Sequence, residues 1–136
     1  MWSCPACSTL LLLENRHWRC SHGHSFDIAK EGYVNLLLAN QKHSSEPGDN
    51  KLMINGRRRF LEQGYYAPMA QQIAKLLVTH SRLKNMLLHD AGCGEGYYLQ
   101  KVVESLRSNG IEVQGCGNDI SKVAIQKASK QYSGLH

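Results

Sequence analysis

Three cysteines and a histidine near the N-terminus constrain the fold of this chain more than any other feature. Cys4, Cys7, Cys20 and His24 are spaced as C-x2-C-x12-C-x3-H. Three thiolates and one imidazole suit the tetrahedral coordination of Zn²⁺, and each close pair can lie on one tight turn. A segment this short cannot bury a large core, so metal binding would supply its folding free energy, about 10 kcal/mol or more. The spacing predicts a zinc ribbon-like module over residues 1–38, with a closed, structural site.

The fourth ligand has alternatives, because His22 and His17 lie close to the same turn. We favour His24, since three intervening residues allow its ring to turn back toward Cys20. The alternative for the whole cluster is a set of buried or free thiols beside an incidental histidine.

Composition and charge limit the class of protein. The chain has 136 residues and a net charge of +5, which modestly favours polyanionic partners. The N-terminus does not resemble a signal peptide, and an odd number of cysteines, five, indicates reduced thiols and a cytoplasmic location. The longest leucine run, Leu10–Leu13, is far too short to span a membrane, so we expect no membrane association. Cys93 and Cys116 are interpreted as packing residues.

Residues 39–58 are polar, contain a Pro-Gly turn signal and are interpreted as a linker, with a helix beginning after Asp49. Residues 59–136 alternate helical and strand patterns. The helical patterns cover residues 69–80, 97–110 and 121–132, and the strand patterns cover residues 85–92 and 111–119. This order predicts two parallel strands in a right-handed β-α-β unit, and therefore an α/β fold.

A glycine loop follows the first predicted strand. In "DAGCGEG", Asp90 precedes Gly92, Gly94 and Gly96, whereas a dinucleotide fingerprint would need glycine in place of Tyr97. Glycines let bare backbone approach a ligand at the carboxyl end of a sheet. S-adenosylmethionine suits this loop better than a dinucleotide, because it has no pyrophosphate and its cationic sulfonium and amino groups favour a nearby acid.

The second element of this pattern is Asp119, at the end of the next predicted strand and 25 positions after Gly94. An acid there can accept both hydroxyls of a ribose. A lone glycine loop is often only a tight turn. The order strand, glycine loop, helix, strand, acid predicts a nucleotide-like cofactor.

Several segments together resemble a known family, the 23S ribosomal RNA guanine-N1-methyltransferases. The matching stretches are "CPAC", "CSHGHSFD", "AKEGYVNLL", "PGD", "RRRFLEQGYYAP", "GCGEGYY" and "DISKVAIQKASKQY". They follow one another through residues 4–132 and resemble the N-terminal half of these enzymes. The resemblance implies a zinc-binding module that docks RNA, followed by the first part of a Rossmann-like class I methyltransferase domain over residues 59–136. It also implies methyl transfer from S-adenosylmethionine to N1 of a guanine in a 23S rRNA hairpin loop.

The resemblance also implies roles for individual residues. The zinc ligands fall on the same four residues that the spacing selects. The cofactor contacts fall on the loop Gly92–Gly96, chiefly Gly94 and Glu95, and on Tyr66, while Asp119 takes the ribose role. His89 departs from the family pattern, since an apolar strand residue is usual there, so we expect a more exposed or strained strand end.

Basic side chains could meet RNA phosphates, although a solvated basic face is the simpler explanation for each of them. They are Arg16, Arg19, Lys30, Arg57, Arg58 and Arg59. Trp18 could stack on a base or fill the core of the zinc module.

Members of the family continue with further strands, so we expect this chain to be truncated and catalytically incomplete alone, and its uncovered sheet to favour self-association. We nominate no residue as the acceptor of the N1 proton. The alternative function is a non-enzymatic zinc-ribbon RNA-binding module with a vestigial cofactor fold.

Overall fold

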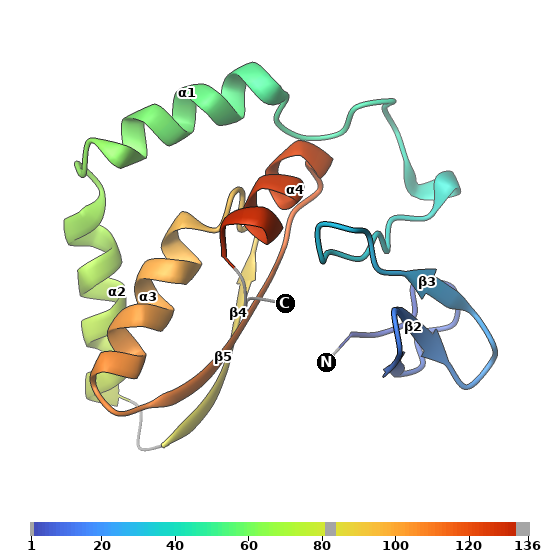
Figure 1. Ribbon diagram of the computed structural model, residues 1–136, viewed down its shortest axis with the longest axis horizontal. Coiled ribbons are helices and arrows are strands. Elements are labelled where there is room, and N and C mark those ends of the chain that lie inside the picture. Colours follow the sequence, from blue (N-terminus) through green and yellow to red (C-terminus); the bar gives the residue numbers. More distant parts are fainter. Residues whose placement is uncertain (1, 81–83, 133–136) are drawn as a thin grey trace. The chain divides into compact units, whose positions relative to one another are not determined.

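The computed structural model describes residues 2–80 and 84–132, so the last four residues of the predicted methyltransferase segment lie outside them. The chain divides into two compact units, Met1–Pro47 and Gly48–His136 (Figure 1). The division falls inside the segment predicted as a linker, residues 39–58.

The first unit contains a three-stranded antiparallel sheet with the order β1-β2-β3. Its elements are β1 (Leu11–Glu14), β2 (His17–Cys20), β3 (Ser25–Asp27) and the short 3-10 helix η1 (Ala39–Gln41). Asn15 turns the first hairpin with a φ of 53°, in the left-handed region that asparagine tolerates better than most residues. Leu11 is paired with Cys20 and Leu13 with Trp18, so Cys20, one of the predicted zinc ligands, lies within the sheet.

The core of the first unit is small. Among residues 2–47, its buried residues are Cys4, Leu11 and Cys20. Partly buried side chains surround them, namely Trp2, Cys7, Trp18, Phe26 and Leu36. Trp18 therefore packs against the core. Strands of three and four residues around so few buried groups leave little hydrophobic free energy, as expected for a module stabilised by a metal.

The second unit is an α/β layer structure. Its helices are α1 (Lys51–Glu62), α2 (Ala67–His80), α3 (Tyr97–Ser108) and α4 (Lys122–Gln131), and its strands are β4 (Asn85–Ala91) and β5 (Glu112–Asn118). The two strands pair in parallel along their whole length, from Asn85 opposite Glu112 to Ala91 opposite Asn118. Helix α3 packs against both strands, and α2 packs on α3 (Figure 1). The predicted α/β class and the predicted parallel pair are confirmed.

The core of the second unit forms where the apolar face of α3 meets α2 and β5. Leu99, Val102, Val103 and Leu106 are all at most 4% exposed. These four residues recur every three or four positions, which places them on one side of a helix. Ala74 of α2, with no exposed surface, allows the two helices to approach closely.

Helix α1 begins where the sequence suggested, because Asn50 accepts a hydrogen bond at its cap from the backbone N–H of Met53. The helix lies against α4. Side chains link the two helices, with Lys127 donating to Asn55 and Arg58 donating to Gln131. Helix α1 is therefore held within the second unit by its contacts with α4.

Within residues 2–80 and 84–132, no helix combines the length and the apolar character that a membrane crossing requires.

Truncation of Leu106 tests this core. We expect Leu106→Ala to lower the free energy of unfolding of the second unit by about 2–5 kcal/mol, because its fully buried side chain would leave a cavity. Leu87→Ala is the matched control, since Leu87 is 55% exposed on β4 and its loss should change the stability by less than about 0.5 kcal/mol. Urea unfolding followed by far-ultraviolet circular dichroism reports on the second unit, which contains the four α-helices found in the described part of the chain. Equal effects would contradict the assignment of this core.

Candidate functional site

The structure brings the four predicted zinc ligands together. The donor atoms of Cys4, Cys7, Cys20 and His24 all lie within 4.8 Å of one another. Cys7 Sγ lies 3.7 Å from Cys20 Sγ, and His24 Nδ1 lies 3.4 Å from Cys20 Sγ and 3.6 Å from Cys4 Sγ. The antiparallel pairing of β1 with β2 carries Cys20 back toward the first cysteine pair.

These separations fit one tetrahedral ion. With Zn–S of about 2.3 Å and Zn–N of about 2.0–2.1 Å, a tetrahedron has edges of about 3.8 Å between sulfurs and about 3.6 Å between sulfur and nitrogen. The sulfur–sulfur and sulfur–nitrogen distances given above lie within about 0.2 Å of those edges. Four protein donors complete the coordination of Zn²⁺, so the arrangement is structural and leaves no position for a substrate.

The surroundings of the cluster favour a metal-binding thiolate. Cys7 Sγ lies 3.1 Å from Thr9 Oγ1. Hydrogen bonds from the side chain and the backbone of Thr9, with a further one from His22, lower the pKa of Cys7 to about 5. The side chain of His22 therefore contacts the cluster through its hydrogen bond to Cys7, while His24 supplies the nitrogen donor that lies among the three sulfurs.

The loop that follows β4 forms the second candidate site. The backbone N–H groups of Gly92 and Cys93 both donate to the carbonyl of Asn118, at 2.8 and 3.0 Å. The N–H of Gly96 donates to the carbonyl of Cys93 at 2.9 Å, which turns the chain into α3. The glycine loop is thereby fixed at the carboxyl end of the parallel strands, where open α/β sheets bind ligands.

Asp119 fastens this loop to the end of β5. Its Oδ2 accepts the backbone N–H of Gly94 at 2.9 Å, and its Oδ1 accepts the N–H of Ser121 at 2.7 Å. A carboxylate has about four lone-pair sites, so each oxygen retains capacity for one more donor. Asp119 is only partly buried and can therefore still meet ligand hydroxyls.

The three glycines of the loop differ in what surrounds them. A Cβ built on Gly92 would meet nothing within 4 Å, and one on Gly94 would meet only Nη1 of Arg57, at 3.9 Å. A Cβ on Gly96 would lie 3.0 Å from the ring of Tyr132. Gly92 and Gly94 therefore present open backbone, whereas packing accounts for glycine at position 96. The cofactor role of Gly96 stays a prediction.

Glu95 is the buried charge of the loop. Its side chain is 5% exposed, and its Oε2 lies 3.0 Å from Nε of Arg58 on α1. This ion pair lacks hydrogen-bond geometry at Oε2. The sequence suggested Arg58 as a phosphate contact, but in the structure its guanidinium pairs with Glu95. This partner could have been recognised only from the packing of α1 against α4.

The remaining predicted residues lie around the same loop. Asp90 precedes it, and burial raises the pKa of this carboxyl, with His89 lowering it and Asp119 raising it further. His89 is exposed, as expected from its departure from the family pattern. Tyr66 is 41% exposed and contacts Phe60 edge-on, with 5.6 Å between ring centroids.

Tyr98 and the cysteines Cys93 and Cys116 complete the description of the second candidate site. Burial raises the pKa of Tyr98, Tyr66 and Tyr97 raise it further, and Arg57 lowers it, so these groups lie within electrostatic range of Tyr98. Cys93 and Cys116 serve as packing residues, as predicted. A Cβ on Gly117 would lie 2.9 Å from Cys93 Sγ, and Cys116 is 6% exposed.

These residues fit S-adenosylmethionine. The two open glycines would admit a ligand against bare backbone, and Asp119 offers acceptors one strand away. Asp90 adds negative charge near a sulfonium or ammonium group. The fit rests on the open side of the loop, which a side chain at Gly92 or Gly94 would fill.

Zinc content tests the choice between two histidines. We expect His24→Ala to lose tight zinc binding, and His22→Ala to retain about one equivalent, because only His24 places a nitrogen among the three sulfurs. Zinc measured by mass spectrometry after extensive dialysis distinguishes them. Tryptophan fluorescence, which arises from Trp2 and Trp18 of the first unit, should show loss of that unit in His24→Ala alone. Retention of zinc by His24→Ala with loss in His22→Ala would reverse the assignment.

A pair of alanine variants tests the two kinds of glycine. Both Gly92 and Gly96 have positive φ, 81° and 84°, so alanine at either position should destabilise by about 1–2 kcal/mol. Gly96→Ala should destabilise by a further 1–3 kcal/mol or so, since its methyl group would press on Tyr132. Thermal unfolding of both variants measures the difference. Identical stabilities would show that Tyr132 does not close that side of the loop.

Comparison with known proteins shows similarity in both units of the chain. Residues 2–45 match the zinc-ribbon family model described as "RlmA, N-terminal". The chain is 32% identical to the 23S rRNA (guanine(748)-N(1))-methyltransferase of Streptomyces fradiae, over 95% of this chain and 44% of that protein.

Two further relatives carry the name putative 23S rRNA (guanine-N(1)-)-methyltransferase. They come from Micromonospora griseorubida and from Bacillus subtilis (strain 168), where the protein is YxjB. Each is 32% identical, over 95% and 99% of this chain and 47% and 48% of the relative, respectively.

The chain spans about half the length of the curated relatives it matches. A zinc-ribbon match implies Zn²⁺, and methyltransferase relatives imply S-adenosylmethionine, so both predicted cofactors are supported. Residues 2–45 are thus similar to the N-terminal zinc ribbon of RlmA, and the chain as a whole is similar to part of the 23S rRNA guanine-N1-methyltransferases named above.

Proposed function

We propose that this chain acts in the S-adenosylmethionine-dependent methylation of N1 of a guanine in 23S rRNA. The observation that carries the proposal is the loop after β4, which is open at Gly92 and Gly94 and bonded to Asp119. The printed names of three relatives, all 23S rRNA guanine-N1-methyltransferases, support the same reaction.

The residues of the second unit would bind and orient the cofactor, which supplies an activated methyl group. Asp119 would accept the ribose hydroxyls through the lone pairs that its two backbone donors leave available. Backbone at Gly92 and Gly94 would contact the ligand directly, and Glu95, held by Arg58, would keep the loop in shape. Asp90 and Tyr66 would border the cationic end.

The zinc ribbon would bind RNA. Zn²⁺ held by Cys4, Cys7, Cys20 and His24 would fix the β1–β2 hairpin. Exposed basic side chains of this unit, such as Arg16 and Lys30, would contact phosphates. Arg19 is also exposed, and its Nη1 lies 3.9 Å from Oε2 of Glu14.

The chemistry of guanine restricts the RNA target. N1 lies on the edge that pairs with cytosine, so a methyl group can reach it only when the base is unpaired or extruded. Unpaired bases in RNA are concentrated in loops and bulges. A guanine in a hairpin loop is therefore the target we propose, and an rRNA substrate would place the chain in the cytoplasm.

The alternative, a non-enzymatic zinc-ribbon RNA-binding module, is less well supported. A vestigial cofactor fold would need no open backbone at Gly92 or Gly94, whereas the described structure leaves both uncovered by neighbouring side chains except for Arg57. The relatives are moreover named as methyltransferases.

Substitution of Asp119 tests the proposal. The zinc-loaded chain should bind S-adenosylmethionine, and Asp119→Asn should weaken binding about 10-fold to 100-fold, because hydrogen bonds to a charged acceptor contribute about 1.5–3 kcal/mol. Isothermal titration calorimetry measures the affinity. Glu112→Gln is the control, since Glu112 is an exposed acid at the opposite end of β5.

Two results would refute this assignment. One is the absence of S-adenosylmethionine binding by the folded, zinc-loaded chain. The other is equal binding by Asp119→Asn and the unaltered chain, which would remove the carboxylate from the cofactor site.

A further inference from the structure

Arg57 of α1 lies beside the glycine loop, but the function proposed above gives it no role. Its Nη1 is the single atom among the described residues that would come within 4 Å of a Cβ on Gly94, at 3.9 Å. Its side chain is 53% exposed, so it covers the open side of the loop without being buried there. Arg57 also lies close enough to Tyr98 to oppose the effects that raise the pKa of that phenol.

The position of Arg57 is fixed by an acid on the preceding turn. Nη2 of Arg57 lies 2.8 Å from Oδ2 of Asp49. The carbonyl of Asp49 accepts the hydroxyl of Ser121 at 2.6 Å, and the N–H of Ser121 donates to Asp119. One edge of the guanidinium is thus tied to the corner that holds Asp119, while Nη1 is directed toward Gly94.

The turn before Asp49 is itself packed on that corner. A Cβ on Gly48 would lie 2.8 Å from Cγ2 of Ile120 and 2.9 Å from the backbone nitrogen of Ser121. Only glycine fits there, since its φ is also 81°. Arg57 is therefore held on the second unit by the turn as well as by its own helix.

Charge around the loop identifies what Arg57 can bind. Asp90 and Asp119 suit the sulfonium, the ammonium group and the ribose of S-adenosylmethionine, but they would repel its carboxylate. Arg58 faces the buried Glu95 and is engaged there. Arg57 offers a cation on the open side of the loop, and a guanidinium can bind a carboxylate through two parallel hydrogen bonds.

We propose that Arg57 binds the carboxylate of the methionine moiety of S-adenosylmethionine, and that Asp49 positions its guanidinium. The inference rests on the proposed function, because it names the contact for one end of the same cofactor. It makes the site specific for ligands that carry a free α-carboxylate.

A ligand that lacks the group provides the sharpest test. Decarboxylated S-adenosylmethionine retains the adenosine, the sulfonium and the amino group but has no carboxylate. We expect Arg57→Gln in the zinc-loaded chain to weaken S-adenosylmethionine at least 10-fold by calorimetry. The same variant should bind the decarboxylated ligand as well as the unaltered chain does, because the group that Arg57 recognises is already missing.

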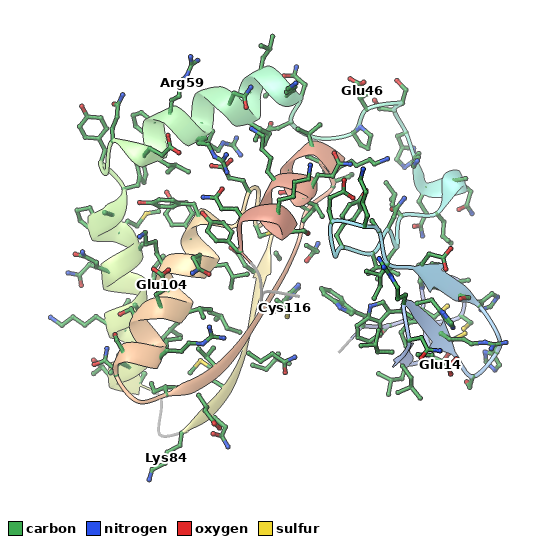
Figure 2. All side chains as sticks on the ribbon, viewed as in Figure 1. Glu14, Glu46, Arg59, Lys84, Glu104 and Cys116 are labelled. Carbon is green, nitrogen blue, oxygen red and sulfur yellow. The ribbon has the colours of Figure 1, made fainter. Side chains whose placement is uncertain are left out.

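Control variants separate this contact from general charge and from folding. Arg59→Gln removes the same charge from the outer side of α1, where its side chain points away from the other helices (Figure 2), and should leave both affinities unchanged. Asp49→Asn should weaken S-adenosylmethionine less than Arg57→Gln does, with the same preference for the carboxylated ligand. Arg57→Lys keeps the charge and should recover part of the affinity, which guards against a folding defect in Arg57→Gln.

Other outcomes would overturn the inference. Equal losses for both ligands would make Arg57 a structural residue, and unchanged affinity for S-adenosylmethionine would remove it from the site. Weaker binding of a 23S rRNA hairpin with no change in S-adenosylmethionine affinity would assign Arg57 to RNA phosphate. In these three cases a normal effect of Asp119→Asn would leave the proposed function standing, whereas no binding by the unaltered chain would refute both.

Discussion

The two oxygens of Asp119 hold the candidate cofactor site together, because they accept backbone N–H groups from two separate segments. One is the loop after β4, at Gly94, and the other is the turn before α4, at Ser121. Ser121 continues the connection to the backbone of Asp49. One carboxylate therefore fixes the ends of both parallel strands and the start of α1. A charged acceptor makes these bonds roughly twice as strong as neutral ones.

The sequence was sufficient where a pattern has a fixed geometric meaning. The apolar positions of α3 recur with helical spacing, so its buried face from Leu99 to Leu106 could be predicted. The C-x2-C-x12-C-x3-H spacing selected four donors that the antiparallel hairpin brings within bonding reach of one ion. The parallel strands followed from the alternation of helix and strand, because a chain must cross over the sheet to pair in parallel.

The sequence was insufficient where the partner of a residue depends on tertiary packing. Three consecutive arginines look alike in sequence, yet Arg58 pairs with Glu95, Arg57 with Asp49, and Arg59 is exposed. Which face of α1 turns inward is decided by α4, about 70 residues later in the chain, through contacts such as that of Lys127 with Asn55. Likewise, no local pattern could show that an aromatic ring fills the space beside Gly96.

The ring of Tyr132 makes the two ends of the glycine loop different. Tyr132 and Ala128 occupy the space beside Gly96, while the space beside Gly92 stays clear. An elongated molecule lying along the loop would therefore have free space beside Gly92, whereas the ring of Tyr132 would block the space beside Gly96. The two ends of such a molecule are not interchangeable, so the backbone alone discriminates between its two possible orientations before any charged side chain contributes.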